Sequence, residues 1–132
     1  MNCILDTQAF LWSMISPERL SDRAGDVIRD PRNTVYVSVV TFWEIALKYS
    51  AGKLELAKVL PDDFPSVAKR AGFDVLPLTE TEAATFYQLA RAGHKDPFDR
   101  MIIWQAISRK LRLISNDASF SVYRESGLKI IW

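Results

Sequence analysis

The sequence predicts an α/β fold, a three-layer α/β/α sandwich around a central, mostly parallel, five-stranded sheet. Short β-rich runs alternate with segments of helical pattern along the chain, the order of elements typical of parallel α/β domains. The short runs are almost continuously apolar, which favours strands covered by helices on both faces. With 132 residues the chain is long enough for one such domain, and we assign residues 1–132 to it.

Each element is predicted from its local pattern. Five runs rich in apolar and β-branched residues are predicted as strands, at residues 3–5, 35–39, 73–76, 113–115 and 129–132. Helices are predicted between them, at residues 7–14, 21–30, 41–51, 62–71, 79–92, 97–110 and 118–125. Right-handed crossovers then place helices on both faces of the sheet. The segment 54–65, with two prolines, is predicted to leave the compact core as a clip or a hairpin of helices.

Two of the predicted helices carry clear signals. In the third, Phe42 and Ile45 lie at the spacing that lines one buried face, and Gly52 is well placed to end the helix. The sixth contains the run 101–107, which is apolar nearly all round. We therefore expect the sixth helix to be covered on two sides, by the sheet and by a second surface such as a subunit interface.

The composition indicates a soluble globular protein, since 48% of the residues are hydrophobic and 25% are charged. The single cysteine, Cys3, excludes an intramolecular disulfide and favours a reducing compartment. The sequence shows no signal-peptide pattern and no apolar run long enough to cross a membrane, so we expect a cytoplasmic protein with no membrane partner. A net charge of +1 neither requires nor excludes a nucleic-acid partner.

Four carboxylates occur where a strand gives way to a loop or helix, or near a helix start: Asp6, Glu44, Asp99 and Asp117. Ligands of parallel sheets bind beyond the carboxyl ends of the strands, so these acids are expected to share one pocket. Oxygen ligands without a His or Cys cluster indicate Mg²⁺ or Mn²⁺ rather than zinc. Asp6 and Asp99 are predicted as the principal ligands, and Glu44 and Asp117 as ligands that bind directly or through water. This arrangement favours metal-dependent hydrolysis of phosphodiesters.

Other polar residues near the four acids are assigned supporting roles. Thr7, Ser115 and Asn116 are predicted to orient the acids or the water by hydrogen bonds. Basic residues that would hold RNA phosphates near the metal are Lys48, Arg91, His94, Lys95 and Arg100, although each also suits a solvated surface. The aromatic residues Trp12, Trp43, Trp104 and Phe98 are interpreted as core or interface in preference to base stacking.

Several of the acids also have a structural explanation. Thr41 and Glu44 have the spacing of a capping box, and Thr79 and Glu82 repeat it where nothing indicates chemistry. Asp96 is best explained as the N-cap of the sixth helix. Each acid alone is therefore weak support for a site. Their convergence is what favours function, because several carboxylates in one pocket repel one another unless a cation neutralises them.

A set of short motifs, spread over nearly the whole chain, adds a family resemblance. The motifs are Leu5-Asp6-Thr7, Trp43-Glu44-Ile45-Ala46 with Lys48, Gly52-Lys53-Leu54, Leu76-Pro77-Leu78-Thr79, His94-Lys95-Asp96-Pro97-Phe98-Asp99-Arg100, Ser115-Asn116-Asp117, and the closing Phe120 and Tyr123. With them the chain closely resembles PIN-domain ribonucleases of the VapC type, the toxins of type II toxin-antitoxin pairs. One mild departure is Asn116, where many members have alanine.

The resemblance implies a function and partners. Asp6, Glu44, Asp99 and Asp117 correspond to the acidic quartet of the family, which binds Mg²⁺ or Mn²⁺ for endonucleolytic cleavage of RNA. The family also implies a homodimer with a PIN-like parallel sheet, and inhibition by a small VapB-like antitoxin whose tail enters the acidic groove.

Three other functions share features with this one. A phosphoacceptor receiver domain would need an acid after the third strand, where the chain has Leu76-Pro77-Leu78. A phosphatase with an aspartate nucleophile would need a second acid two residues after Asp6, where the chain has Gln8. A non-catalytic PIN-like module that binds RNA or protein partners stays open as the alternative, since a fold does not guarantee activity. The four intact acids favour the enzyme.

Overall fold

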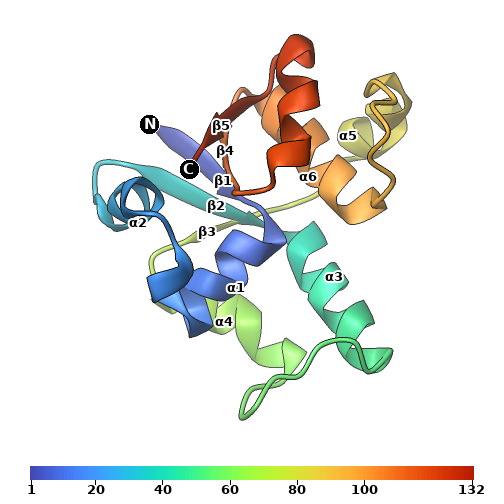
Figure 1. Cartoon of the computed structure of the whole chain (residues 1–132). Helices are drawn as coiled ribbons and strands as arrows, with labels where there is room; N and C mark the ends of the chain where they lie inside the picture. The colour runs from blue at the N-terminus through green and yellow to red at the C-terminus, as the bar shows by residue number, and fades with distance from the viewer.

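The computed structural model describes residues 1–132 and contains one parallel sheet of five strands (Figure 1). The strands are β1 (Asn2–Leu5), β2 (Thr34–Ser38), β3 (Asp74–Leu76), β4 (Arg112–Ile114) and β5 (Lys129–Ile131). Their order in the sheet is β3-β2-β1-β4-β5. β1 therefore lies at the centre, where Ile4 is in register with Tyr36 of β2 and Leu113 of β4. The predicted five-stranded parallel sheet is confirmed.

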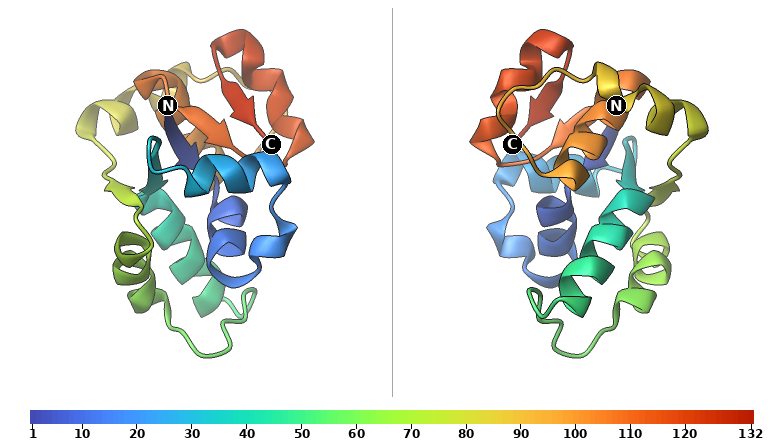
Figure 2. Two further views of the ribbon diagram at one scale, coloured as in Figure 1. Left: turned by 90° about the vertical axis from the view of Figure 1, so that its left-hand side faces the viewer. Right: turned by 90° about the vertical axis from the view of Figure 1, so that its right-hand side faces the viewer.

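Helices cover both faces of the sheet, as the apolar strands predict. They are α1 (Thr7–Ile15), α2 (Asp22–Arg29), α3 (Val39–Ser50), α4 (Phe64–Arg70), α5 (Glu80–Thr85) and α6 (Pro97–Arg109), with 3₁₀ segments η1 (Pro17–Arg19), η2 (Pro61–Asp63), η3 (Phe86–Gln88) and η4 (Ala118–Ser126). α1, α2 and α4 lie on one side, and α5, α6 and η4 lie on the other (Figures 1 and 2). None of these helices combines the length and apolar character that crossing a bilayer requires.

The two faces of the sheet bury two separate hydrophobic cores. Side chains alternate along β1, so that Cys3 and Leu5 enter one core and Ile4 enters the other. Phe10 of α1 anchors the first core and is fully buried. Ile102 and other residues of α6 form the second core with Phe120 and Tyr123 of η4. The central strand β1 is therefore buried on both of its faces.

The start of α3 differs from the prediction. The helix begins at Val39 instead of Thr41, and Ser38 is its N-cap, with the hydroxyl accepting a hydrogen bond from the N–H of Val40 (3.1 Å). Thr41 therefore lies inside the helix, where its hydroxyl shares a buried hydrogen bond with Thr7 (3.0 Å). The predicted capping box of Thr41 and Glu44 is wrong, because a serine at the strand end caps the helix earlier.

The segment predicted as helix 79–92 is also shorter. α5 ends at Thr85, and the chain then turns through η3 and runs without regular structure to the start of α6. Arg100 stabilises this route, because its guanidinium donates to the carbonyl groups of Leu89 and Ala90 (both 3.2 Å) and lies over the ring of Phe86. These two carbonyls fall in the last turn of the predicted helix, where no N–H of that helix could pair with them, and a side chain from α6 binds them instead.

The structure also shows which form segment 54–65 takes and what covers the second side of α6. Segment 54–65 is not a hairpin of helices, because it has no helix before η2 begins at Pro61. The second cover of α6 comes from within the chain, where Trp104 donates to the hydroxyl of Thr85 in α5 (3.2 Å). α5 and α6 are therefore packed together (Figure 1), and α5 supplies a second cover for α6.

A buried polar network joins the start of α3 to α6 and α5. The Ser38 hydroxyl donates to Oε1 of Gln105 (2.6 Å), and Nε2 of Gln105 donates to the carbonyl of Pro77 and to Glu82 (3.2 and 3.3 Å). Glu82 is the N3 residue of a capping box with Thr79, as predicted, and forms an ion pair with Arg109 (2.7 Å). The network links the two helices that carry Glu44 and Asp99.

The ion pair gives the stability of the fold a defined pH dependence. Burial of the Glu82 carboxyl opposes its charge, but hydrogen bonds from Arg109, Thr79 and Gln105 outweigh burial and lower the pKa of Glu82 to about 2 from 4.5. A lowered pKa stabilises the folded state above pH 4.5 and ceases to do so as the pH falls through 2. We expect Glu82→Gln to lower the free energy of unfolding at pH 7, with the deficit shrinking between pH 4.5 and 2.

Urea unfolding of wild type and Glu82→Gln across this pH range measures the effect. Glu80→Gln is the matched control, since Glu80 is exposed and is not part of an ion pair. A deficit that stays constant down to pH 2 would contradict the proposed role of the charge.

Candidate metal centre

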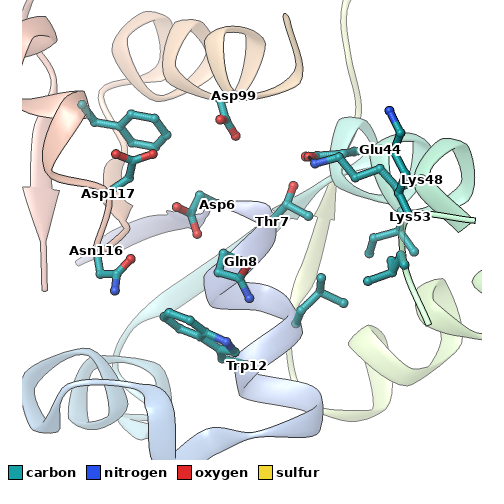
Figure 3. Close-up of a pocket in the computed structure, with 14 residues that line it drawn as sticks. Asp6, Thr7, Gln8, Trp12, Glu44, Lys48, Lys53, Asp99, Asn116 and Asp117 are labelled. Carbon is teal, nitrogen blue, oxygen red and sulfur yellow. Dashed lines mark hydrogen bonds and ion pairs between the residues drawn. The ribbon is translucent and has the colours of Figure 1, made fainter. Parts of the chain in front are cut away.

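A cleft of about 620 Å³ lies beyond the carboxyl ends of the central strands (Figure 3). All four acids that the sequence singled out line it, namely Asp6, Glu44, Asp99 and Asp117. In Figure 3 they lie on four separate elements around the cavity, with Asp117 and Glu44 on opposite sides. The structure thus brings together carboxylates that are up to 111 positions apart, from Asp6 to Asp117.

Each acid is held by the local structure of its element. Asp6 is the N-cap of α1 and accepts from the N–H of Ala9 (2.7 Å). Asp117 caps η4 and accepts from the N–H of Ser119 (3.0 Å). Asp99 lies in the first turn of α6, at the positive end of the helix dipole. Asp6 and Asp117 therefore cap a helix and line the cleft at the same time.

Glu44 has a buried carboxylate with one unpaired oxygen. Its side chain is buried, and Lys48 one turn later donates to Oε2. The other oxygen, Oε1, is buried and has no hydrogen-bond partner in the chain. A buried carboxylate oxygen without a partner is costly. A cation in the cleft would supply the partner that the chain itself does not.

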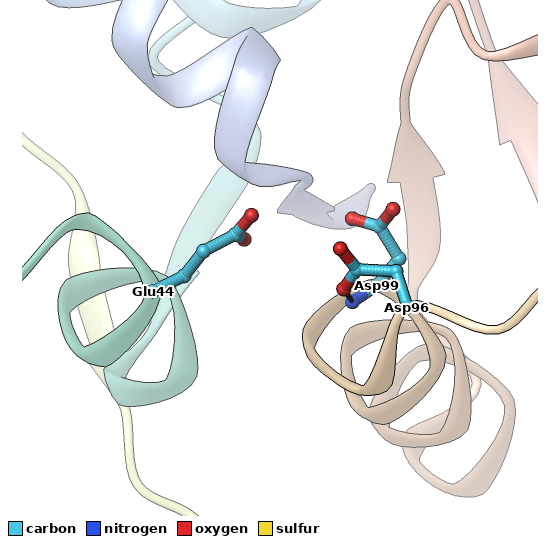
Figure 4. A group of neighbouring side chains, drawn as sticks. All are labelled: Glu44, Asp96 and Asp99. Carbon is cyan, nitrogen blue, oxygen red and sulfur yellow. Dashed lines mark hydrogen bonds between the residues drawn. The ribbon is translucent and has the colours of Figure 1, made fainter. Parts of the chain in front are cut away.

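The tightest acidic group differs from the predicted ligand pair. Glu44, Asp96 and Asp99 each offer an oxygen within 4.8 Å of the others (Figure 4), whereas Asp6 and Asp117 lie outside this group. Asp96 is the N-cap of α6, as expected, with Oδ1 accepting from the N–H groups of Phe98 and Asp99 (2.9 and 3.0 Å). Asp96 lies three residues before Asp99 at the same end of α6, so its carboxylate also reaches the site. This proximity could have been predicted from the spacing of the two residues in the sequence.

Asp6 is the most deeply buried of the aspartates in the cleft. The hydroxyl of Ser115 donates to its Oδ2 (2.5 Å) and accepts from the N–H of Asp117 (3.1 Å), so one serine positions two acids. Burial raises the pKa of Asp6 to about 6, against the hydrogen bonds from Ser115 and Ala9 and with the negative charges of Asp99 and Asp117. A nearby cation would stabilise the charged form of a carboxylate in such surroundings.

The only histidine, predicted to bind RNA, contacts an acid of the cleft but does not line the cleft itself. Nε2 of His94 lies 3.0 Å from Oδ2 of Asp99, and Nδ1 lies 3.3 Å from the hydroxyl of Ser119, which donates to Asp117 (2.6 Å). Burial raises the pKa of Asp99 despite the hydrogen bond to His94, and the charges of Asp96 and Glu44 raise it further. His94 and Ser119 therefore connect Asp99 to Asp117.

Of the basic residues that were predicted to bind RNA, only Lys48 lines the cleft. Lys48 lines the cleft, where burial opposes its charge but the contact with Glu44 and the charges of Asp96 and Asp99 raise its pKa. Arg91 and Lys95 are exposed and do not line the cleft. Arg100 also lies outside the lining, because its guanidinium binds the carbonyls before α6.

Three residues of the cleft were not identified by sequence reasoning. Lys53 adds a second positive charge beside Lys48, and Gln8 and Trp12 of α1 line the side nearest Asn116 (Figure 3). Gln8 and Trp12 are four residues apart and therefore share a helix face, a spacing that was visible in the sequence. Trp12 had been interpreted as core or interface, and it is instead half-buried at the wall of the cleft.

The parallel sheet and the acidic cleft beyond its carboxyl ends agree with a match to a protein family. The chain belongs to the PIN domain family, whose profile matches residues 3–125. Among curated proteins it is similar to Ribonuclease VapC22 of Mycobacterium tuberculosis, with 25% identity over 129 residues that cover 98% of this chain and 97% of the relative.

Solved structures show the same fold. VapBC2 from Rickettsia felis, bound to a DNA fragment from its promoter, matches with a TM-score of 0.69 and 16% identity over 99% of this chain and 98% of the other. VapBC-1 from nontypeable Haemophilus influenzae matches with a TM-score of 0.68 and 17% identity over 99% and 97% of the two chains. At these identities the likeness concerns the fold.

Proposed function

We propose that this chain is a metal-dependent endoribonuclease that acts as the toxin of a type II toxin-antitoxin pair. The observation that carries the proposal is the buried, unpartnered Oε1 of Glu44 beside the carboxylates of Asp96 and Asp99. Similarity to Ribonuclease VapC22 over nearly the whole chain supports RNA as the substrate. Membership of the PIN domain family supports hydrolysis of phosphodiester bonds in this cleft.

The donor set fits a hard divalent cation. The group of Glu44, Asp96 and Asp99 offers only carboxylate oxygens, which Mg²⁺ and Mn²⁺ prefer. Glu44, Asp96 and Asp99 would hold the ion, and Asp6 and Asp117 are the other carboxylates that line the cleft. Mg²⁺ or Mn²⁺ supplies positive charge that makes a water more acidic and stabilises negative charge on the phosphate.

The remaining chemistry belongs to the chain. Ser115 holds Asp6 and the backbone of Asp117 in fixed positions, and both carboxylates can then accept hydrogen bonds from the attacking water. Lys48 and Lys53, on the other wall of the cleft, would attract the phosphates that flank the scissile bond. A local pair of lysines does this although the net charge of the chain is only +1.

The partners follow from the relatives. VapBC-5 from Mycobacterium tuberculosis, which has a similar fold, is described as a member of the VapBC family of toxin-antitoxin systems, and this supports a VapB-like antitoxin as the partner of this chain. A homodimer, implied by the family resemblance, stays a prediction. Trp43 and Leu47 support it, because they are exposed on one face of α3 by 62% and 47%, and burial of such a patch favours association.

The test is cleavage of a structured cellular RNA pool by the purified chain with Mg²⁺ or Mn²⁺, compared with EDTA and with the Asp6→Asn variant. We expect discrete products that require the metal and are absent for the variant, which separates catalysis from a contaminating nuclease. RNA binding without cleavage, by a folded and antitoxin-free protein, would instead identify the non-catalytic binding module. Equal cleavage by wild type and variant would reject the assigned site.

A further inference from the structure

An aromatic wall borders the cleft on the side away from the lysines. Trp12 of α1 lines the cleft and is half-buried, so part of its indole stays accessible. Trp132 packs against it, with ring centroids 5.9 Å apart and planes inclined by 48°. A braced indole that is still accessible from a cavity suits stacking of a planar ligand, because little conformational freedom is lost on binding.

Two amide side chains line the same cleft as this indole. Gln8 precedes Trp12 by one helical turn, and Asn116 approaches from the loop after β4 (Figure 3). Both side chains are exposed, and neither amide makes a hydrogen bond within the chain. An amide offers a donor and an acceptor together, the pattern needed to bind the edge of a nucleobase.

The position of these residues relative to the acids defines what they would contact. Gln8 is two residues from Asp6, and Asn116 is adjacent to Asp117. The backbone therefore keeps each amide close to one of these two aspartates. Lys48 and Lys53 lie on the opposite side of the cavity (Figure 3). The cleft is thus divided into a basic wall for phosphates, a central acidic group, and a wall of indole and amides.

We propose that Trp12, Gln8 and Asn116 form a nucleobase subsite that holds one unstacked base of the RNA next to the scissile phosphate. The inference rests on the proposed function and deepens it, since it names the substrate class as RNA with an exposed base at the cleavage site. The indole supplies stacking, and the two amides read the edge of the base. A base within a duplex is excluded, because its two faces are already covered by its neighbours.

The test is a coupling experiment between the base and Trp12. A single-stranded RNA oligonucleotide with one mapped cleavage site is prepared in a series in which each nucleotide near that site is replaced by an abasic one. Wild type should show one position at which the abasic nucleotide raises KM by roughly tenfold or more, the size of a stacking contact. In Trp12→Ala the same replacement should change KM by less than about threefold.

Two further variants keep the experiment decisive if Trp12→Ala folds poorly. Trp12→Phe retains an aromatic ring and should restore most of the coupling, and Gln8→Ala should change the base preferred at that position alone. Tyr87→Ala is the control, because Tyr87 is an exposed aromatic residue (81%) outside the cleft, and it should behave as wild type. Equal abasic effects in wild type, Trp12→Ala and Trp12→Phe at every position would overturn the subsite.

Failure of the proposed function is distinguished by a binding arm. If wild type cleaves no RNA, fluorescence anisotropy of the same oligonucleotides with wild type and Trp12→Ala measures the coupling in Kd. The subsite again requires that the abasic penalty depend on Trp12. Binding with no such dependence, or no binding at all, overturns the subsite, whereas cleavage without coupling overturns the subsite and leaves the nuclease assignment in place.

Discussion

Asp99→Asn and Glu44→Gln will each reduce RNA cleavage by about a hundredfold or more. Each substitution removes a negative charge from the tightest acidic group of the cleft while keeping the size of the side chain. Even groups that only support metal ligands typically contribute roughly ten- to a hundredfold to affinity or activity, so loss of a ligand should cost at least the upper end. Initial rates of product formation at saturating Mg²⁺ measure the effect.

Replacing one aspartate of the cleft by asparagine should leave the fold intact. Without divalent cations, Asp6→Asn and Asp99→Asn are expected to raise Tm or leave it unchanged, because removing one carboxylate relieves repulsion among the acids. In Asp6→Asn, the amide oxygen of asparagine can replace the carboxylate oxygen that accepts from the N–H of Ala9. Added Mg²⁺ should raise the Tm of wild type more than that of either variant. Thermal unfolding with EDTA and with Mg²⁺ tests both statements.

Asp62→Asn is the matched control, since Asp62 is exposed on η2 and outside the cleft. It should cleave RNA and respond to Mg²⁺ as wild type does. Wild-type cleavage by Asp99→Asn and Glu44→Gln would show that the acidic group has another purpose, and a lower Tm for Asp6→Asn in EDTA would show that its hydrogen bonds outweigh charge repulsion.

Gln105→Leu is expected to lower the free energy of unfolding by about 3 kcal/mol and to reduce cleavage as well. Gln105 is fully buried, and its amide joins Ser38 at the start of α3 to Glu82 of α5. Leucine fills the space but leaves the Ser38 hydroxyl without its acceptor and deprives Glu82 of a donor. Urea unfolding at pH 7 measures the loss.

The effect on cleavage follows from position. Gln105 lies six residues after Asp99 on α6, and Ser38 caps the helix that carries Glu44. The hydrogen bond between Gln105 and Ser38 therefore helps to set the separation of the two helices that hold the acidic group. We expect an activity loss of roughly tenfold, as found for groups that orient metal ligands, with a higher Mg²⁺ concentration needed for half-maximal rate.

A double-mutant cycle separates this role from general destabilisation. The double variant Ser38→Ala with Gln105→Leu should lose less free energy of unfolding than the two single variants together. Both changes remove the same hydrogen bond, the one between Ser38 and Gln105. Gln88→Leu at an exposed position of η3 is the control for the glutamine change. Additive losses, or an unchanged Mg²⁺ requirement in folded Gln105→Leu, would argue against positioning by this contact.

Much of the fold was predictable from local patterns. Apolar runs separated by helical segments predicted all five strands, because parallel strands buried on both faces leave a continuous apolar signature. The residues at which helices and strands begin and end were harder to predict. Ser38 and Thr41 are both good N-caps by composition, and the start of α3 was decided by where β2 ends and by the bond from Ser38 to Gln105, 67 positions away. No local pattern contains such a partner.

The acidic cleft shows the same division. The α/β plan, the strand-end location of Asp6 and Asp117, and the four acids that meet in the cleft could all be predicted from the sequence. The grouping of Asp96 with Glu44 and Asp99, and the place of Trp12 in the wall of the cavity, became visible only in the folded chain. The physical reason is that spacing along the chain specifies the face of a strand or helix, whereas the distance between two elements depends on how their side chains pack.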